Sequence, residues 1–313
     1  MHAWESVQKT LDVIEARISE EISIDNLAEV AALSPFYYQR LFSRLVKKPV
    51  REYIKLRRLA RSCESLRGTE NRILDIALEN GFGSHEVFTR TFKDAYGMTP
   101  TEYRESETRL NNFQKPDLLL NYTMIDLDVP LISDGLVLEI NRKKLDEPVT
   151  FMGVKGFVSI PGQFPIGKTT GVSEPGEIWW RFGEVESTIP SKPAGRKLGV
   201  AYHDTAPEGC FPYFVGAEVE HGVTHDDFQT WTLPTGEYVV CKFEAENDDE
   251  LVSVAMPKAF GYIGQWQNQK GLKHGNFGAE MYFNNSGNPN DESMEFAYME
   301  IWALWLEGDA GNG

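Results

Sequence analysis

Apolar positions recur with helical spacing through residues 1–107, and one stretch of this pattern is present twice. Residues 34–53 and 84–103 each follow a short apolar pattern that contains alanine, and each opens with a serine after a tight turn. Serine is a favoured N-cap, so each copy predicts a short helix, a turn and a second helix. The repeat therefore predicts two helix-turn-helix units. The residues shared at an offset of fifty are Ser34/Ser84, Arg40/Arg90, Phe42/Phe92, Glu52/Glu102 and Tyr53/Tyr103.

The pattern changes after residue 107. Residues 108–133 carry turn residues among short apolar runs, which predicts an ordered connector. Residues 134–308 then alternate in the order strand, helix, strand, strand, and this order occurs twice. The expected strands are 149–158, 197–202, 213–220, 231–245 with an internal turn, 277–283 and 295–305, and the expected helices are 176–185 and 248–267.

These patterns predict a multidomain chain. An all-α double helix-turn-helix domain occupies residues 1–107, the connector residues 108–133, and an α+β domain of two βαββ repeats residues 134–308. Such repeats build an antiparallel sheet with two helices on one side and a cleft where the halves meet.

Charge separates the two domains. The net charge is −16, of which residues 1–107 carry −1 and the remainder −15. Within the first domain, residues 34–67 hold ten Lys or Arg against Glu52 and Glu64, a stripe that suits phosphates. A solvated helix face is the alternative for such a stripe. The acidic second domain, with six of the seven tryptophans, would be repelled by DNA and is expected to do something else.

Cofactor, metal and membrane functions find no support in the sequence. The three cysteines, Cys63, Cys210 and Cys241, are widely spaced and lack a CxxC pair, which indicates a reduced protein without a structural zinc. No apolar run is long enough to span a bilayer, and the first 18 residues predict an amphipathic helix and not a signal peptide. We expect a cytoplasmic protein without cofactor, metal or membrane contact.

The second copy carries a set of motif residues: Ile76-Ala77, Gly81-Phe82, Ser84, Phe88, Arg90, Phe92-Lys93, Gly97, Pro100 and Tyr103-Arg104. Through this motif, residues 23–104 resemble the DNA-binding domain of the bacterial AraC/XylS transcription regulators. The resemblance implies seven helices, with a long helix through residues 53–60 that links the two units. Such a linker can place both recognition helices in successive major grooves, about 34 Å apart. The chain departs from the family at Lys47-Lys48-Pro49, where a glycine is usual, so the resemblance does not fix the shape of that loop.

The resemblance also implies which residues face DNA. Arginine pairs with guanine, glutamine with adenine, and a glutamate can accept from cytosine. The two copies differ at Phe36 against Glu86 and at Gln39 against Thr89, which predicts an asymmetric site. The expected contacts, with Arg44 added from the basic stripe, are Pro35, Phe36, Gln39, Arg40, Arg44, His85, Glu86, Thr89 and Arg90.

Alternatives remain for several of these positions. Core packing is the alternative for Phe36, Tyr37 and Tyr38, and we favour it for Tyr38 because Phe88 repeats it. Phe36 has no apolar echo, so contact with a thymine methyl is expected. His85 is equally compatible with a helix start that touches no base.

Four segments of the last half of the chain carry a second resemblance: WTLPTGEYVVCKFEA, the helix that ends in YIGQW, FGAEMYF and FAYMEIWALW. Through them, this half resembles the GyrI-like effector-binding domains. The resemblance implies a cleft for hydrophobic, often cationic molecules around one buried glutamate, which maps to Glu280. A surface charge on a strand is the alternative for this residue. The other candidate pocket residues are Tyr282, Trp180, Tyr213, Tyr262, Trp266 and Trp302, and only one of the adjacent Trp179 and Trp180 is expected to face the cleft.

The leading hypothesis is a ligand-responsive, sequence-specific transcription regulator that is not an enzyme. Its expected partners are duplex DNA, a small-molecule effector and RNA polymerase. One alternative is that the C-terminal domain hydrolyses or sequesters a toxic compound, with Glu280 as general base. No nucleophile elbow, HExxH or P-loop supports that alternative. Another is that the acidic domain docks on a partner protein.

Overall fold

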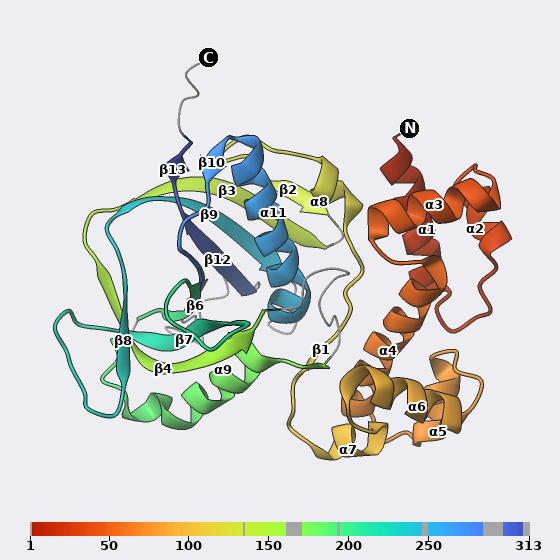
Figure 1. Cartoon of the computed structure of the whole chain (residues 1–313), viewed down its shortest axis with the longest axis horizontal. Helices are drawn as coiled ribbons and strands as arrows, with labels where there is room; N and C mark the ends of the chain where they lie inside the picture. The colour runs from red at the N-terminus through yellow and green to blue at the C-terminus, as the bar shows by residue number, and fades with distance from the viewer. Residues whose placement is uncertain are drawn as a thin grey trace, which may run out of the picture. The chain divides into compact units, whose positions relative to one another are not determined.

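The computed structural model describes residues 2–133, 135–160, 171–192, 195–245, 250–283 and 297–308. The chain forms two compact units (Figure 1). The first comprises the residues up to Tyr122 together with residues 171–173, which include strand β5 (Gly171–Val172). The second comprises residues 123–160 and the described residues from Glu174 onward. Whether function also divides at residues 107 and 134 remains a prediction. No helix in the described parts is long and apolar enough to cross a bilayer.

The first unit contains the seven helices that the family resemblance implies. Side chains cap both recognition helices, because Ser34 accepts a hydrogen bond from the Tyr37 amide and Ser84 from the Val87 amide. Thr99 and Glu102 form a reciprocal capping box at the last of the seven. These helices are α1 (Ala3–Ala16), α2 (Ile24–Val30), α3 (Pro35–Val46), α4 (Val50–Gly68), α5 (Ile73–Glu79), α6 (His85–Tyr96) and α7 (Pro100–Glu105).

The turns repeat as closely as the helices. The turn before α3 has Ala32 at φ 55°, and the turn before α6 has Gly81 at φ 76°. The recognition helices end alike, with Lys47 at φ 60° and Gly97 at φ 80°. Lys47 therefore takes the left-handed conformation that favours glycine, and the departure from the family pattern does not change the type of C-cap.

Each helix-turn-helix unit has its own apolar core. The first core gathers α1, α2, α3 and the start of α4, and includes Phe42 and Tyr53. The second gathers the rest of α4 with α5, α6 and α7, and includes Phe92 and Tyr103. Helix α4 therefore contributes to both cores and connects them.

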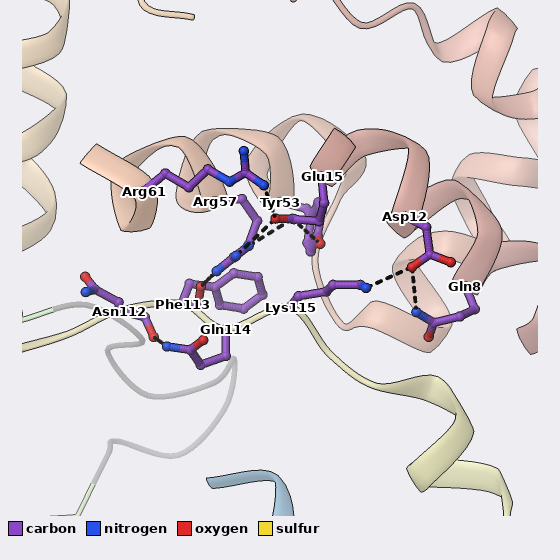
Figure 2. A network of polar contacts seen from close by, with 10 residues as sticks. All are labelled: Gln8, Asp12, Glu15, Tyr53, Arg57, Arg61, Asn112, Phe113, Gln114 and Lys115. Atoms are coloured by element: carbon purple, nitrogen blue, oxygen red, sulfur yellow. Dashed lines mark hydrogen bonds and ion pairs between the residues drawn. The ribbon is translucent and has the colours of Figure 1, made fainter. Parts of the chain in front are cut away.

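The first part of the connector, residues 108–122, folds onto the first unit, whereas residues 123–133 belong to the second. Glu15 accepts hydrogen bonds from the Tyr53 hydroxyl at 2.8 Å and from Nε of Arg57 at 2.9 Å, and Arg57 also donates to the carbonyl of Phe113 at 2.6 Å (Figure 2). Lys115 pairs with Asp12 at 2.8 Å. Strand β1 (Leu110–Asn111) pairs with β5, and helix α8 (Leu118–Tyr122) packs against α1.

The second unit is an antiparallel sheet in the order β2-β3-β9-β12-β11-β6-β7-β4-β8. Its two predicted repeats are β4-α9-β6-β7 and β9-α11-β11-β12, and they meet where β6 pairs with β11. A short pair of strands, β10 (Leu272–Lys273) and β13 (Leu306–Glu307), lies outside this sheet. The other bounds are β2 (Leu131–Ser133), β3 (Leu136–Leu145), β4 (Val149–Ser159), α9 (Glu174–Val185), η1 (Glu186–Thr188), β6 (Lys197–Tyr202), β7 (Cys210–Val219), β8 (Gln229–Leu233), β9 (Gly236–Ala245), η2 (Leu251–Ala255), α11 (Met256–Gln269), β11 (Phe277–Tyr282) and β12 (Ala297–Leu304).

One expected strand was wrong, and β2 and β3 were not among the expected strands. The strand expected at 231–245 is two strands, because the turn at Pro234-Thr235 sends β8 to pair with β4 and β9 to pair with β3 and β12. The helix expected at 248–267 is confirmed over its described part, as the π-helical turn η2 followed by α11. The start of that predicted helix at residues 248–249, and residues 295–296 of the last predicted strand, lie outside the described residues.

Candidate functional site

The exposed face of α3 carries the residues predicted to contact DNA in the first unit. Phe36 is 69% exposed, and the guanidinium of Arg40 lies 5.7 Å from the centre of its ring. Tyr38 is fully buried, as its echo Phe88 indicated. The other candidates on this helix, Pro35, Gln39, Arg40 and Arg44, are exposed.

Helix α6 presents a chemically different face. His85, Glu86 and Arg90 are exposed, whereas Thr89 is half-buried and its hydroxyl has no hydrogen-bond partner among the described residues. A hydrogen bond from Ser84 lowers the pKa of Glu86. Glu86 is therefore charged at neutral pH, and it can accept from a cytosine amino group but would be repelled by a phosphate.

Two exposed residues of the recognition helices were missing from the predicted contacts. Tyr37 is 56% exposed on α3, and Val87 is exposed at the equivalent position of α6. The signal was present in the sequence, because positions 38 and 42 face the core and position 37 is rotated about 100° from position 38.

Glu280 is the centre of the candidate effector site. It lies in β11 with 7% of its surface exposed. The hydroxyls of Tyr213 in β7 and Tyr282 in β11 each donate to its Oε2 at 3.0 Å. Burial raises the pKa of Glu280, and the two hydroxyl donors offset only part of that effect. Glu280 is thus a buried carboxylate and not a surface charge.

Both helices of the second unit reach this carboxylate. Trp179 of α9 donates its indole N–H to the Tyr213 hydroxyl at 3.1 Å, and its ring lies edge-on to Tyr282 with centroids 4.6 Å apart. The sulfur of Met256 of α11 lies 3.8 Å from the Tyr282 hydroxyl oxygen. The two helices therefore flank the face of the sheet that carries Glu280.

Gly199 makes this arrangement possible. It lies in β6 as the register partner of Glu280. A Cβ atom at this position would lie 2.4 Å from the Tyr213 hydroxyl, 3.0 Å from Oε2 of Glu280 and 3.2 Å from the Trp179 ring. Any residue other than glycine would displace the three side chains, so Gly199 belongs to the site although it offers no functional group.

The second unit buries two other glutamates in its described part, and both have basic partners. Glu218 accepts from Nε of Arg196 at 2.8 Å, and Glu300 pairs with Lys143 at 2.6 Å. Around Glu280, the described residues supply only neutral hydroxyl donors. Within the described part of the chain, this carboxylate therefore differs from the other two in having no basic side chain as a partner.

The remaining predicted pocket residues do not join this cluster. Trp180 is 54% exposed, and its neighbour Trp179 lies at the site instead. Tyr262 and Trp266 are occupied with the backbone of Ile125, since the tyrosine hydroxyl accepts from its amide at 3.1 Å and the indole donates to its carbonyl at 2.8 Å. Trp302 pairs in register with Ala279, so it points to the face opposite Glu280.

A cavity of about 490 Å³ lies beside the cluster. Glu280 does not line it, but Ala201 and Gly278 do, and this pair is one step along the same face from Gly199 and Glu280. Gly199, Ala201 and Gly278 are all small, but Tyr213, Glu280 and Trp179 fill the space above Gly199, and Phe260 lies over Gly278. Other lining residues are Tyr202, His203, Asp204 and Phe211.

Two protein families match the chain. One, described as a helix-turn-helix domain, matches residues 27–106. The other, described as an integron-associated effector binding protein, matches residues 166–303.

Individual relatives match the first of these regions. The uncharacterized HTH-type transcriptional regulator YbfP of Bacillus subtilis is 44% identical over 104 residues, which are 33% of this chain and 35% of YbfP. The chain thus spans about a third of YbfP. The regulatory protein SoxS of Salmonella typhimurium is 35% identical over 98 residues, which are 31% of this chain and 92% of SoxS.

One solved structure overlaps the second region more broadly. The structure of SAV2435 bound to tetraphenylphosphonium covers 53% of this chain and 92% of that chain, at 17% identity and a TM-score of 0.38. A likeness of that size says nothing about the ligand of the present chain. The helix-turn-helix match and the near-complete coverage of SoxS decide the family. The chain belongs to the AraC-type family of transcription regulators, and it carries an effector-binding domain behind its DNA-binding domain.

Proposed function

We propose that this protein reads an asymmetric DNA site with α3 and α6 and changes transcription when a lipophilic cation binds at Glu280. The observation that carries the effector half of the proposal is the isolation of Glu280, a buried carboxylate with two hydroxyl donors and no basic partner among the described residues. A buried charge is costly unless it is paired, so such a site favours a cation that arrives from outside.

The surroundings of Glu280 support an aromatic cation. Rings of Trp179, Tyr213 and Tyr282 lie around the carboxylate, and each ring face can add about 0.5 to 2 kcal/mol of cation–π attraction. The proposed effector therefore combines a positive charge with a ring system.

The DNA half of the proposal rests on the two unlike recognition helices. An exposed aromatic pair, Phe36 and Tyr37, offers apolar contacts for thymine methyls, whereas α6 offers the acceptor Glu86 at the position equivalent to Phe36. We propose DNA reading for residues 1–107, effector binding for residues 134–308 and coupling for the connector 108–133. A regulator bound at a promoter would act through RNA polymerase. Because the bacterial chromosome lies in the cytoplasm, we place this activity there.

The effector proposal is tested with a pair of probes of equal size and opposite charge. Isothermal titration of the full chain with tetraphenylphosphonium is expected to show binding, and tetraphenylborate is expected to bind at least tenfold more weakly, which is about 1.4 kcal/mol. Glu280→Gln should remove this preference. Glu300→Gln is the matched control, because it replaces a buried glutamate on the opposite face and should leave the preference intact. Equal affinity for both probes would contradict the proposal.

A second function is favoured by one observation, the raised pKa of Glu280. Buried carboxyls with raised pKa values act as general acids or bases in many enzymes, so hydrolysis of a bound compound is the competing function. Mass spectrometry of compounds incubated with the protein separates the two. Turnover that disappears in Glu280→Gln would favour the enzyme, and unchanged compounds that still bind would favour the sensor.

A further inference from the structure

The two helix-turn-helix units are separated by a groove on one side of α4. The groove has a volume of about 580 Å³. The loop 19–22 that follows α1 lines one wall, and the turn 81–83 with Val87 and Thr91 of α6 lines the other. Arg51, Ile54, Lys55 and Arg58 of α4 line it between the two walls. The apolar cores of the two units lie on either side and do not merge.

Arg58 spans this groove with a single side chain. Its Nε donates to the carbonyl of Ile18 at 2.8 Å and one terminal nitrogen donates to the carbonyl of Glu20 at 2.7 Å, both in the first half of the unit. The other terminal nitrogen donates to the carbonyl of Gly81 at 2.7 Å, in the turn before the second recognition helix. The guanidinium is planar and rigid, so its three bonds fix three backbone segments relative to one another.

The turn that Arg58 holds is shaped to receive it. A Cβ atom at Gly81 would lie 2.7 Å from Cζ of Arg58 and 2.9 Å from its Nε. The backbone conformation alone does not demand glycine, because Ala32 occupies the equivalent turn position at φ 55°. The absence of a side chain at Gly81 therefore serves the contact with Arg58 as well as the turn.

We propose that Arg58 is a positioning residue that sets the separation of the two recognition helices and thereby the spacing of the two half-sites that the protein accepts. The inference rests on the proposed DNA reading by α3 and α6. Two helices that enter successive major grooves must keep a fixed separation, and α4 contributes residues to both cores. Arg58 locks the angle between the halves without touching a base.

The first test needs no DNA. Spin labels at Arg44→Cys and Asp94→Cys occupy equivalent exposed positions of α3 and α6, in a full chain whose half-buried Cys210 is replaced by serine. Pulsed electron–electron double resonance between the two labels should give a narrow distance distribution for the parent. The distribution should be broadened or shifted for Arg58→Ala and Gly81→Ala. Arg61→Ala, on the same helix and 40% exposed, should leave it narrow. Unchanged distributions in both variants would overturn the proposal.

The second test uses DNA sites selected by the parent protein. Arg58→Ala and Gly81→Ala should bind the complete site at least tenfold more weakly but each isolated half-site within twofold of the parent, and they should accept spacings that the parent rejects. Equal losses on complete and half-sites would reduce Arg58 to a general stabilising role and overturn the proposal. If Arg58→Ala does not fold, the same comparison of complete sites and half-sites is made with Arg58→Lys and Gly81→Ala. If the parent selects no DNA motif, the proposed function is refuted. The distance measurement still tests whether Arg58 fixes the separation of the two recognition helices.

Discussion

Glu280 combines burial, two hydroxyl donors and a raised pKa, which makes its ionisation a stability term. The pKa of Glu280 lies above its ordinary value of 4.5 in the folded protein. Between pH 4.5 and the raised pKa, the native state therefore keeps a proton that the unfolded chain has released. Stability contributed by this group is therefore present at pH below 4.5 and is lost as pH rises from there through the raised pKa.

Glu280→Gln should remove this loss. We expect the unfolding temperature of the variant to rise relative to that of the parent as pH increases above 4.5. The fluorescence of the tryptophans, which are concentrated in the second unit, reports the unfolding. Glu208→Gln, an exposed glutamate of the same unit, is the control and should track the parent. Parallel curves for Glu280→Gln and the parent would mean that Glu280 does not titrate above its ordinary range in the folded protein.

Single residues also show how far the sequence predicts the site. The family motif led to Glu280, and strand alternation led to Tyr282 on the same face. Trp179 was passed over for Trp180, because two adjacent helix positions are distinguished only by what packs against the helix. No sequence signal pointed to Gly199, because its importance comes from Glu280, which lies about eighty residues further along the chain.

Helices and strands were more predictable than the contacts between them. Serine caps, apolar spacing and turn residues are local, and they predicted α3 and α6 correctly. The division of 231–245 into β8 and β9 depends on which neighbours each strand finds, and the sequence does not state that. From the sequence, Arg58 was counted only as one member of a basic stripe. Nothing in the local sequence indicates that its partners are three distant carbonyl groups.

The two recognition helices should contribute to different half-sites. Arg40→Ala and Arg90→Ala are each expected to weaken specific binding by about 1 to 3 kcal/mol, because each would remove the proposed bidentate contact with guanine. Selected sequences should lose base preference in one half for Arg40→Ala and in the other half for Arg90→Ala. Binding by the parent should also weaken steeply as salt increases.

A matched variant separates base reading from charge. Arg72→Ala removes an exposed arginine next to α5 and away from the recognition helices. It should leave base preference unchanged in both halves. If Arg40→Ala and Arg90→Ala relax the same half, the asymmetric arrangement of the two readers is wrong.

At the scale of the whole molecule, the chain joins a DNA-binding unit with little net charge to a strongly acidic effector unit. The segment after α7 is not a loose tether, because Arg57 holds the carbonyl of Phe113 and Lys115 pairs with Asp12 (Figure 2). An effector that changes the second unit would therefore act on a connector already fixed to α1 and α4. Such coupling is worth about 1 to 3 kcal/mol in ligand-responsive proteins.

The most direct measurement of the central claim is DNA affinity and promoter transcription by the full chain, with and without saturating tetraphenylphosphonium, for the parent and for Glu280→Gln. We predict that the cation changes affinity or transcription of the parent by about 5- to 150-fold and changes neither for Glu280→Gln. A parent that binds the cation at Glu280 yet shows equal affinity and equal transcription in both states would contradict the account.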